Sequence, residues 1–168
     1  KRESIETNAI SSYYRIGDVG YIAISSFSKP VASEVLDAIN TLGEVKSLII
    51  DLRDNGGGAL SSAIDLSSLF LQKGDIIVST RSNEGVREYF KSNDRITLTM
   101  PLVVIINENS ASASEIFAGA IQDNDRGLVI GRRTFGKGLV QAQVPFSDGS
   151  AMRLTVARYY TPTGRSIQ

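Results

Sequence analysis

Residues 47–58 read SLIIDLRDNGGG, and this stretch decides the fold class because an apolar run ends there in a polar, glycine-rich loop. Residues 47–52 form a short apolar run with β-branched side chains, which is typical of a buried strand. Residues 102–106, LVVII, form a second such run, and a polar turn follows at 107–112. Sites in α/β sheets form at the carboxyl ends of strands, so we expect the functional site at these two loops.

Strand and helix patterns alternate along the rest of the chain, which predicts an α/β domain with a partly parallel sheet. Further strands are expected at 21–24, 76–80, 86–90 and 128–130, the middle two as a hairpin around 83–85. Helices are expected from Pro30 to a stop at Gly43, over 63–70, and over 112–122. A second hairpin is expected from 139–146 and 151–160, across the turn 147–150.

The composition is that of one soluble globular domain spanning residues 1–168, with 42% hydrophobic and 21% charged residues. Lys plus Arg (18) equals Asp plus Glu (18), which argues against nucleic acid as a partner. There is no apolar run of transmembrane length. The start, KRESI, lacks the apolar region of a signal peptide, and both ends are abrupt. We therefore expect an excised piece of a longer protein.

The chain contains no His and no Cys. A Ser-His-Asp triad, a cysteine nucleophile, a disulfide and a histidine- or thiolate-bound metal are therefore excluded within this chain. Any catalysis must come from Ser, Thr, Lys, Tyr, Asp or Glu side chains, and no cofactor is implied.

Residues 107–115 read NENSASASE and allow two interpretations. Ser112 and Glu115 fit a capping box at a helix start. The same geometry would expose a Ser112 nucleophile at a strand-to-helix turn, where the free N–H groups of the helix, particularly that of Ala113, could stabilise an oxyanion. The segment alone does not distinguish a cap from a nucleophile, so a partner base is needed.

Residues 134–141 read TFGKGLVQ, and Lys137 lies between two glycines. One interpretation is a solvated turn lysine. A phosphate loop is weaker, because Gly138 follows the lysine where that motif needs Ser or Thr. The third interpretation is that the glycines allow close backbone approach, so that Lys137 points inward and desolvation makes it a general base. Gln141, an even offset away in a strand, would then hold the amine by a hydrogen bond.

The glycine loop, with Gly56, Gly57 and Gly58 in a row, is expected to approach another backbone closely or to adopt positive φ. Alternatives are a flexible turn and a phosphate cradle, although no adjacent lysine supports the latter. A glycine N–H in this loop could be a second oxyanion donor.

These three segments, together with residues 148–168 (DGSAMRLTVARYYTPTGRSIQ), resemble the C-terminal processing peptidases, also called tail-specific proteases. The match runs in order over nearly the whole chain, and four motifs in register are far more specific than any one of them. The resemblance implies a crotonase- and ClpP-like α/β core, with a mixed β-sheet and flanking helices. It also implies a PDZ domain before this core in the full-length protein, and residues 1–5 resemble the segment that follows that domain.

The resemblance implies a Ser/Lys dyad and assigns each role to a residue. The nucleophile falls on Ser112, the base on Lys137, the supporting residue on Gln141, and the oxyanion donors on Ala113 and Gly58, with Gly57 as the next candidate. Ser110 and Ser114 are the competing nucleophiles, and Ser114 is expected to bond back to the chain inside the helix. Asn109 departs from the family, which usually has Gly there, and we expect positive φ at this position.

The expected activity is that of a serine endopeptidase that cleaves polypeptides with unstructured C-terminal tails through an acyl-enzyme. The resemblance implies a location in the bacterial periplasm or cell envelope and allows a homo-oligomer. The alternatives are a catalytically silent binding module of the same fold and an acyl-CoA-handling crotonase relative. Retention of Ser112, Lys137 and Gln141 together favours the enzyme, and the chain shows no basic pocket signature for the adenine-phosphate part of CoA.

Overall fold

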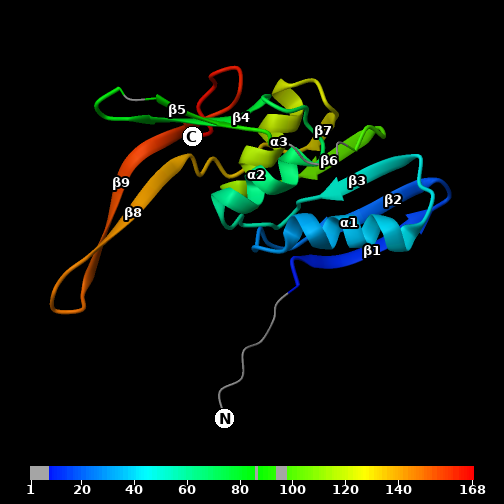
Figure 1. The fold of residues 1–168 in the computed structure, drawn as a ribbon, viewed down its shortest axis with the longest axis horizontal. Coiled ribbons are helices and arrows are strands. Elements are labelled where there is room, and N and C mark those ends of the chain that lie inside the picture. Colours follow the sequence, from blue (N-terminus) through cyan, green and yellow to red (C-terminus); the bar gives the residue numbers. More distant parts are fainter. Residues whose placement is uncertain (1–7, 86, 94–97) are drawn as a thin grey trace, which may run out of the picture.

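The computed structural model describes residues 8–85, 87–93 and 98–168 (Figure 1). The segment 1–5, which entered the family resemblance, lies outside the described residues. The elements are β1 (Ile10–Ile16), β2 (Val19–Ile24), α1 (Val31–Leu42), β3 (Ser47–Asp51), α2 (Leu60–Ser68), β4 (Ile76–Ser82), β5 (Arg87–Lys91), β6 (Leu102–Ile106), α3 (Ala113–Asp123), β7 (Leu128–Gly131), β8 (Leu139–Pro145) and β9 (Ala151–Tyr160).

The first sheet has the strand order β1-β2-β3-β6-β7. Strands β2, β3, β6 and β7 run parallel, and Leu48 of β3 lies opposite Leu102 of β6. The two apolar runs are therefore neighbouring strands, and Ile50 and Val104 at their centres are fully buried. Strand β1 was not predicted from the sequence. It pairs antiparallel with β2 and leaves most of its side chains exposed.

Helix α1 begins after Pro30 and ends at Gly43, whose φ of 73° only glycine adopts readily, as predicted. Helices α2 and α3 pack against each other, and α3 also contacts β7 of the first sheet and β4 of the second. Phe117 of α3 lies at the centre of the core, with its ring 6.3 Å from Phe27 and 5.9 Å from Phe70. Helix α3 therefore lies against both sheets.

The second sheet has the order β5-β4-β9-β8 and is antiparallel throughout. Both predicted hairpins are present, although Val86 of the first lies outside the described residues. The β8–β9 hairpin extends away from the body of the molecule (Figure 1). Among the described residues, no helix combines the length and the apolar character needed to cross a membrane.

Candidate active site

The loops after β3 and β6 lie side by side because their strands are neighbours. Asp54 donates its backbone N–H to Asn107 Oδ1 at 3.0 Å, and its carboxylate accepts the amides of Asn107 and Asn109 at 3.0 and 2.7 Å. These amide hydrogen bonds lower the pKa of Asp54. A backbone hydrogen bond also joins the two loops, since the Ala111 N–H donates to the Asn55 carbonyl at 3.0 Å. The two loops therefore form one unit.

Asn109 does not adopt the positive φ that we expected at this position. The described non-glycine residues with positive φ are Asp54, Ser112 and Asp125. Asn109 instead contributes its side-chain amide to Asp54, across the two loops. The expectation for Asn109 was wrong, and the positive φ values in these two loops belong to Asp54 and Ser112.

The three serines at 110–114 differ in accessibility. Ser110 is fully buried, donates its hydroxyl to the Leu52 carbonyl at 2.7 Å and accepts the N–H of Asn107 at 3.0 Å. Ser114 is also fully buried and donates to the Asn55 carbonyl at 2.9 Å, so it bonds to the glycine loop and not to its own helix. Ser112 is partly exposed. Its hydroxyl is the one of the three that solvent or a ligand can reach.

Ser112 occupies the turn between β6 and α3 with φ 57° and ψ −112°, a region that non-glycine residues rarely adopt. Such strain persists where the surroundings hold it, and it is common at functional sites. Here Ser112 and Glu115 form the predicted capping box, in which the Glu115 carboxylate accepts the Ser112 N–H at 2.7 Å. Gly57 lies against this turn, since a Cβ at Gly57 would lie 2.8 Å from Ser112 Cβ. The predicted close approach of the glycine loop is therefore confirmed.

Gly57 does not supply a free N–H, contrary to its place among the expected oxyanion donors. Its N–H donates to Asn55 Oδ1 at 2.8 Å, and Asn55 is itself fully buried, with its amide bound to the Ile24 carbonyl. The side chain of Asn55 competes for this donor. In this structure the Gly57 N–H is engaged by Asn55, and its role as an oxyanion donor stays a prediction.

Gly58 and Ala113 keep unpaired N–H groups among the described residues. Gly58 forms a parallel bridge with Phe27, in which Phe27 N–H donates to Gly57 O at 2.9 Å and Ala59 N–H donates to Phe27 O at 3.0 Å. In such a bridge the residues flanking Gly58 make the bonds, so its own N–H points away from Phe27. Ala113 is the first residue of α3, where an N–H has no partner within the helix.

The segment that contains Lys137 is fastened to Ser112 through Glu115. The Glu115 carboxylate, only 5% exposed, accepts Gly136 N–H at 2.6 Å and Lys137 N–H at 2.8 Å, in addition to Ser112 N–H. Sequence reasoning assigned Glu115 the role of a cap and missed this bridge. The buried position of Glu115 and its contacts with distant residues cannot be seen in the local pattern.

Lys137 itself is exposed, so the expectation that its side chain points inward was wrong. Its amine makes no ion pair or hydrogen bond with any described residue, Ser112 included. The predicted close approach does occur, because a Cβ at Gly138 would lie 2.7 Å from the backbone nitrogen of Gln168. The interior position beside this segment, however, is taken by the Glu115 carboxylate, which binds the backbone and not the amine.

Gln141 makes no hydrogen bond to Lys137, which was the contact expected for it. Lys137 precedes β8, so the strand alternation does not extend to it. A register shift between Val140 and Gln141 further alters which side chains share a face. Gln141 lies opposite Thr155 and is exposed.

An apolar groove of about 290 Å³ lies beside these loops. Its walls include Leu60, Phe90, Val140 and Val156. Leu60 follows the glycine loop by two residues and Val140 follows Lys137 by three, so the groove adjoins both halves of the candidate site. The carboxylate-bearing Glu88 lies at the same groove.

An accessible serine, two unpaired N–H groups and a lysine segment thus lie on the loops of the candidate site. The sequence matches peptidase family S41 over residues 18–168. The chain belongs to this family. The fold is accordingly the ClpP-like α/β fold of S41 peptidases, which confirms the expected fold class.

Similar S41 proteins include the carboxyl-terminal-processing protease of Synechocystis sp., 44% identical over 151 residues, which cover 89% of this chain and 35% of the relative. The carboxy-terminal processing protease CtpA of Bacillus subtilis is 39% identical over 169 residues, which cover 99% of this chain and 36% of the relative. The solved structure of the photosystem II D1 C-terminal processing protease has a TM-score of 0.86 and 33% identity, covering 99% of this chain and 47% of that protein. The S41 chain described here thus spans about a third of the length of these two curated relatives.

Proposed function

We propose that this S41 chain is the catalytic core of a serine endopeptidase that cleaves polypeptides near their C-terminus, with Ser112 as nucleophile and Lys137 as general base. The observation that carries the proposal is the arrangement around Ser112. Its hydroxyl is accessible, the N–H groups of its neighbour Ala113 and of Gly58 in the adjoining glycine loop are unpaired among the described residues, and Glu115 holds the backbone of Lys137 to that of Ser112.

In the proposed reaction a neutral Lys137 amine takes the proton of the Ser112 hydroxyl as the oxygen attacks the scissile carbonyl. The N–H groups of Ala113 and Gly58 hold the resulting oxyanion, an effect of about 3–4 kcal/mol per donor in comparable enzymes. Lys137 then gives its proton to the departing amine, which leaves an acyl-enzyme on Ser112. Water, deprotonated by Lys137, releases the acyl group. Gln141 is proposed to orient the amine.

The exposed position of Lys137 makes one further step necessary. The amine must turn from solvent to the Ser112 hydroxyl before the proton can move, because general-base catalysis needs hydrogen-bond contact. The backbone of Lys137 is already held by Glu115, so we propose that this step is a change of side-chain rotamer at Lys137. Entry of an extended substrate would exclude water from the amine and favour its neutral form.

The test is cleavage of a peptide with an unstructured C-terminal tail by the Ser112→Ala and Lys137→Ala variants. Both are expected to lose turnover while keeping the wild-type unfolding temperature. Lys46→Ala is the matched control, since Lys46 is also exposed but pairs with Asp18 at the far end of the first sheet. Undiminished turnover in Lys137→Ala would contradict the proposed dyad.

A catalytically silent binding module is the second candidate, and the absence of a hydrogen bond between the Lys137 amine and Ser112 among the described residues favours it. A serine-reactive acylating probe separates the two candidates. Labelling of Ser112 that disappears in Lys137→Ala supports the enzyme. Failure of the probe to label the folded wild-type chain supports the silent module.

The family also supports proposals about the longer protein. We propose that a PDZ domain accompanies this core, that the protein works in the periplasm or cell envelope of a bacterium, and that it acts on polypeptide substrates as a monomer or a homo-oligomer. Cell fractionation tests the location, and light scattering during size-exclusion chromatography measures the oligomeric state. Recovery of the protein in the cytoplasmic fraction would contradict the location.

A further inference from the structure

A row of arginines crosses the second sheet. In the pairing of β4 with β5 and β9, Arg81 lies directly opposite both Arg87 and Arg158. All three side chains are exposed. Adjacent strands are about 4.8 Å apart, so three positive charges project from a span of roughly 10 Å. Like charges opposite each other in a sheet are destabilising, so the folding of the sheet does not explain the row.

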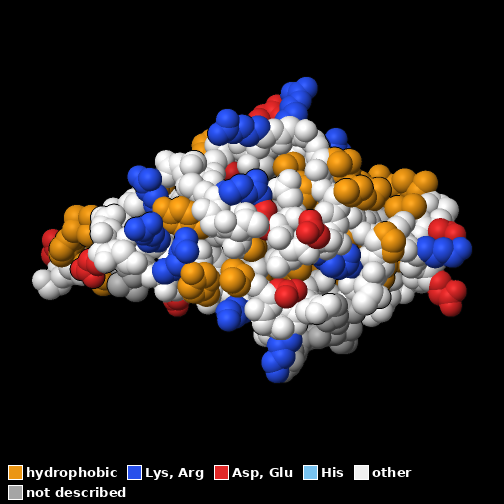
Figure 2. Space-filling model, turned by 90° about the horizontal axis from the view of Figure 1, so that it is seen from above, with side chains coloured by type: hydrophobic (Ala, Val, Ile, Leu, Met, Phe, Trp, Pro, Cys, Tyr) orange, Lys and Arg blue, Asp and Glu red, His pale blue; other side chains and the backbone are white. Residues whose placement is uncertain are grey.

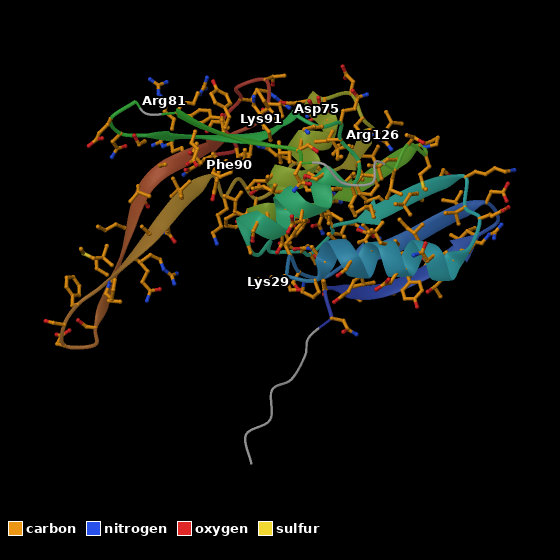
Figure 3. The ribbon with its side chains drawn as sticks, viewed as in Figure 1. Lys29, Asp75, Arg81, Phe90, Lys91 and Arg126 are labelled. Carbon is orange, nitrogen blue, oxygen red and sulfur yellow. The ribbon has the colours of Figure 1, made fainter. Side chains whose placement is uncertain are left out.

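No described carboxylate neutralises this row. Neither Arg81, Arg87 nor Arg158 forms an ion pair with any residue that the structure describes. Glu88, next to Arg87 in sequence, lies opposite Thr80 and lines the apolar groove on the other face of the sheet. Figure 3 accordingly shows Arg81 and Phe90, another groove residue, on opposite sides of this sheet.

Two tyrosines hold part of the row in place. The Arg87 guanidinium lies 5.6 Å from the ring centre of Tyr89 and 5.8 Å from that of Tyr160. It also donates to the Tyr89 hydroxyl at 3.3 Å. Contacts of this kind orient a planar guanidinium and reduce the side-chain entropy that binding would remove. The row is therefore partly preorganised for an anion.

The position of the row connects it with the candidate active site. Arg158 lies opposite Leu139 of β8, and Leu139 follows Lys137 by two residues. The row thus runs from the edge strand β5 across β4 to β9, and the neighbour of β9 is β8, which begins two residues after the proposed base. Figure 2 shows basic side chains gathered on this face, at the base of the projecting β8–β9 hairpin.

We infer that the row formed by Arg81, Arg87 and Arg158 is an exosite for acidic residues of the polypeptide substrate. This inference rests on the proposed function. Carboxylates match the fork of a guanidinium, and an extended peptide presents alternate side chains about 7 Å apart, close enough for two or three carboxylates to lie over the row. The nearness of the row to Lys137 favours a substrate segment flanking the scissile bond over a separate anionic partner.

The test compares two peptides with the same cleavage sequence, one with three Glu and the other with three Gln beside it, each placed in turn on either flank. The Arg81→Gln/Arg158→Gln variant removes two charges of the row. Arg15→Gln/Lys46→Gln is the matched control, because it removes two exposed charges that pair with Asp18 far from the row. Each exposed ion pair contributes about 0.2–1 kcal/mol, so the wild type is expected to show a KM about fivefold lower for a Glu peptide.

The expected preference disappears in the row variant, persists in the control, and weakens as salt rises. Fluorescence anisotropy of the same labelled peptides on Ser112→Ala measures binding without cleavage. Equal binding of the Glu and Gln peptides on both flanks would overturn the exosite. It would also be overturned if the row mediated binding only to vesicles of phosphatidylcholine with phosphatidylserine. If the wild type cleaves none of the peptides, the proposed function is contradicted and the exosite is not. The anisotropy measurement still compares Glu and Gln peptides in that case, because it does not depend on cleavage.

Discussion

Replacement of Glu115 by Gln tests whether one carboxylate fastens the two halves of the site. In the wild type, Oε2 accepts the N–H groups of Ser112 and Lys137, and Oε1 accepts that of Gly136. The amide of Gln keeps one acceptor oxygen and adds a donor. Its best orientation retains the two bonds at Oε2 and directs an NH₂ group at the N–H of Gly136.

The expected loss of stability follows from the interactions that the Gln side chain loses in that orientation. One buried, charge-assisted hydrogen bond disappears, a donor is left facing a donor, and the two remaining bonds lose the negative charge that strengthens them. Bonds to charged groups contribute about 1.5–3 kcal/mol each, so we expect about 2–4 kcal/mol of destabilisation. For a chain of this length that lowers the unfolding temperature by roughly 5–15 °C.

Two assays separate stability from catalysis. Thermal unfolding followed by circular dichroism gives the destabilisation, and peptide cleavage at a temperature where both proteins are folded gives kcat and KM. We expect kcat to fall more than tenfold with little change in KM, since the segment that carries Lys137 loses one of its anchors while the groove is untouched. Tenfold corresponds to about 1.4 kcal/mol in the barrier.

Glu34→Gln is the matched control, because the Glu34 carboxylate also accepts two backbone N–H groups, those of Ala9 at 2.9 Å and Ile10 at 3.1 Å, away from the site. It should lose stability and keep kcat. If Glu115→Gln were destabilised as expected but kept the wild-type kcat, the reasoning that Glu115 positions the base would be refuted.

Three further predictions concern the same loops. Gly57→Ala places a Cβ 2.5 Å from a backbone oxygen and should lower the free energy of unfolding in urea by about 1–3 kcal/mol. A Cβ at Gly56 meets nothing within 4 Å, so Gly56→Ala should change that free energy by no more than about 0.5 kcal/mol. Equal losses in the two variants would contradict the close approach of Gly57. Ser114→Ala should lose about 1 kcal/mol of stability with its hydrogen bond and keep its turnover per folded molecule, and loss of turnover would make Ser114 a rival nucleophile. Burial alone would raise the pKa of Asp51, but hydrogen bonds from Arg53 outweigh burial and lower that pKa below 3.8. The folded state is therefore expected to lose stability as the pH falls below about 4. Asp51→Asn should flatten this loss when urea unfolding is measured across the pH range, and an unchanged pH dependence would argue against the ion pair.

The parts of the fold that were predicted correctly from the sequence carry local signals that have a direct physical cause. The apolar runs at 47–52 and 102–106 can only be buried, and Gly43 and Pro30 delimit a helix by backbone geometry alone. Strand β1 gave a weaker signal, since its side chains are mostly exposed and the strand depends on its pairing with β2.

Sequence reasoning anticipated the backbone features of these loops better than the arrangement of their side chains. The spacing of Ser112 and Glu115 indicated a turn with an accessible hydroxyl, and the glycines indicated close approach. The backbone of Lys137 is held by Glu115, and the N–H of Gly57 is occupied by Asn55. The bond from Lys137 to Glu115 joins residues 22 apart and leaves no local pattern, whereas the bond from Gly57 to Asn55 spans two residues and is a local turn of the kind that Asn favours.

The division of the site between two sheets has a consequence for protein engineering. Ser112, Ala113 and Gly58 all precede residue 132, while Lys137 arrives with the β8–β9 hairpin, whose strand β9 docks onto β4. A cut in the exposed stretch 131–133 would therefore separate the nucleophile and oxyanion donors from the base. With Ser112 and Lys137 in their proposed roles, the two fragments form a split reporter. Its signal would arise when the C-terminal fragment, which begins just after the cut and carries β8 and β9, adds its strands to the larger one.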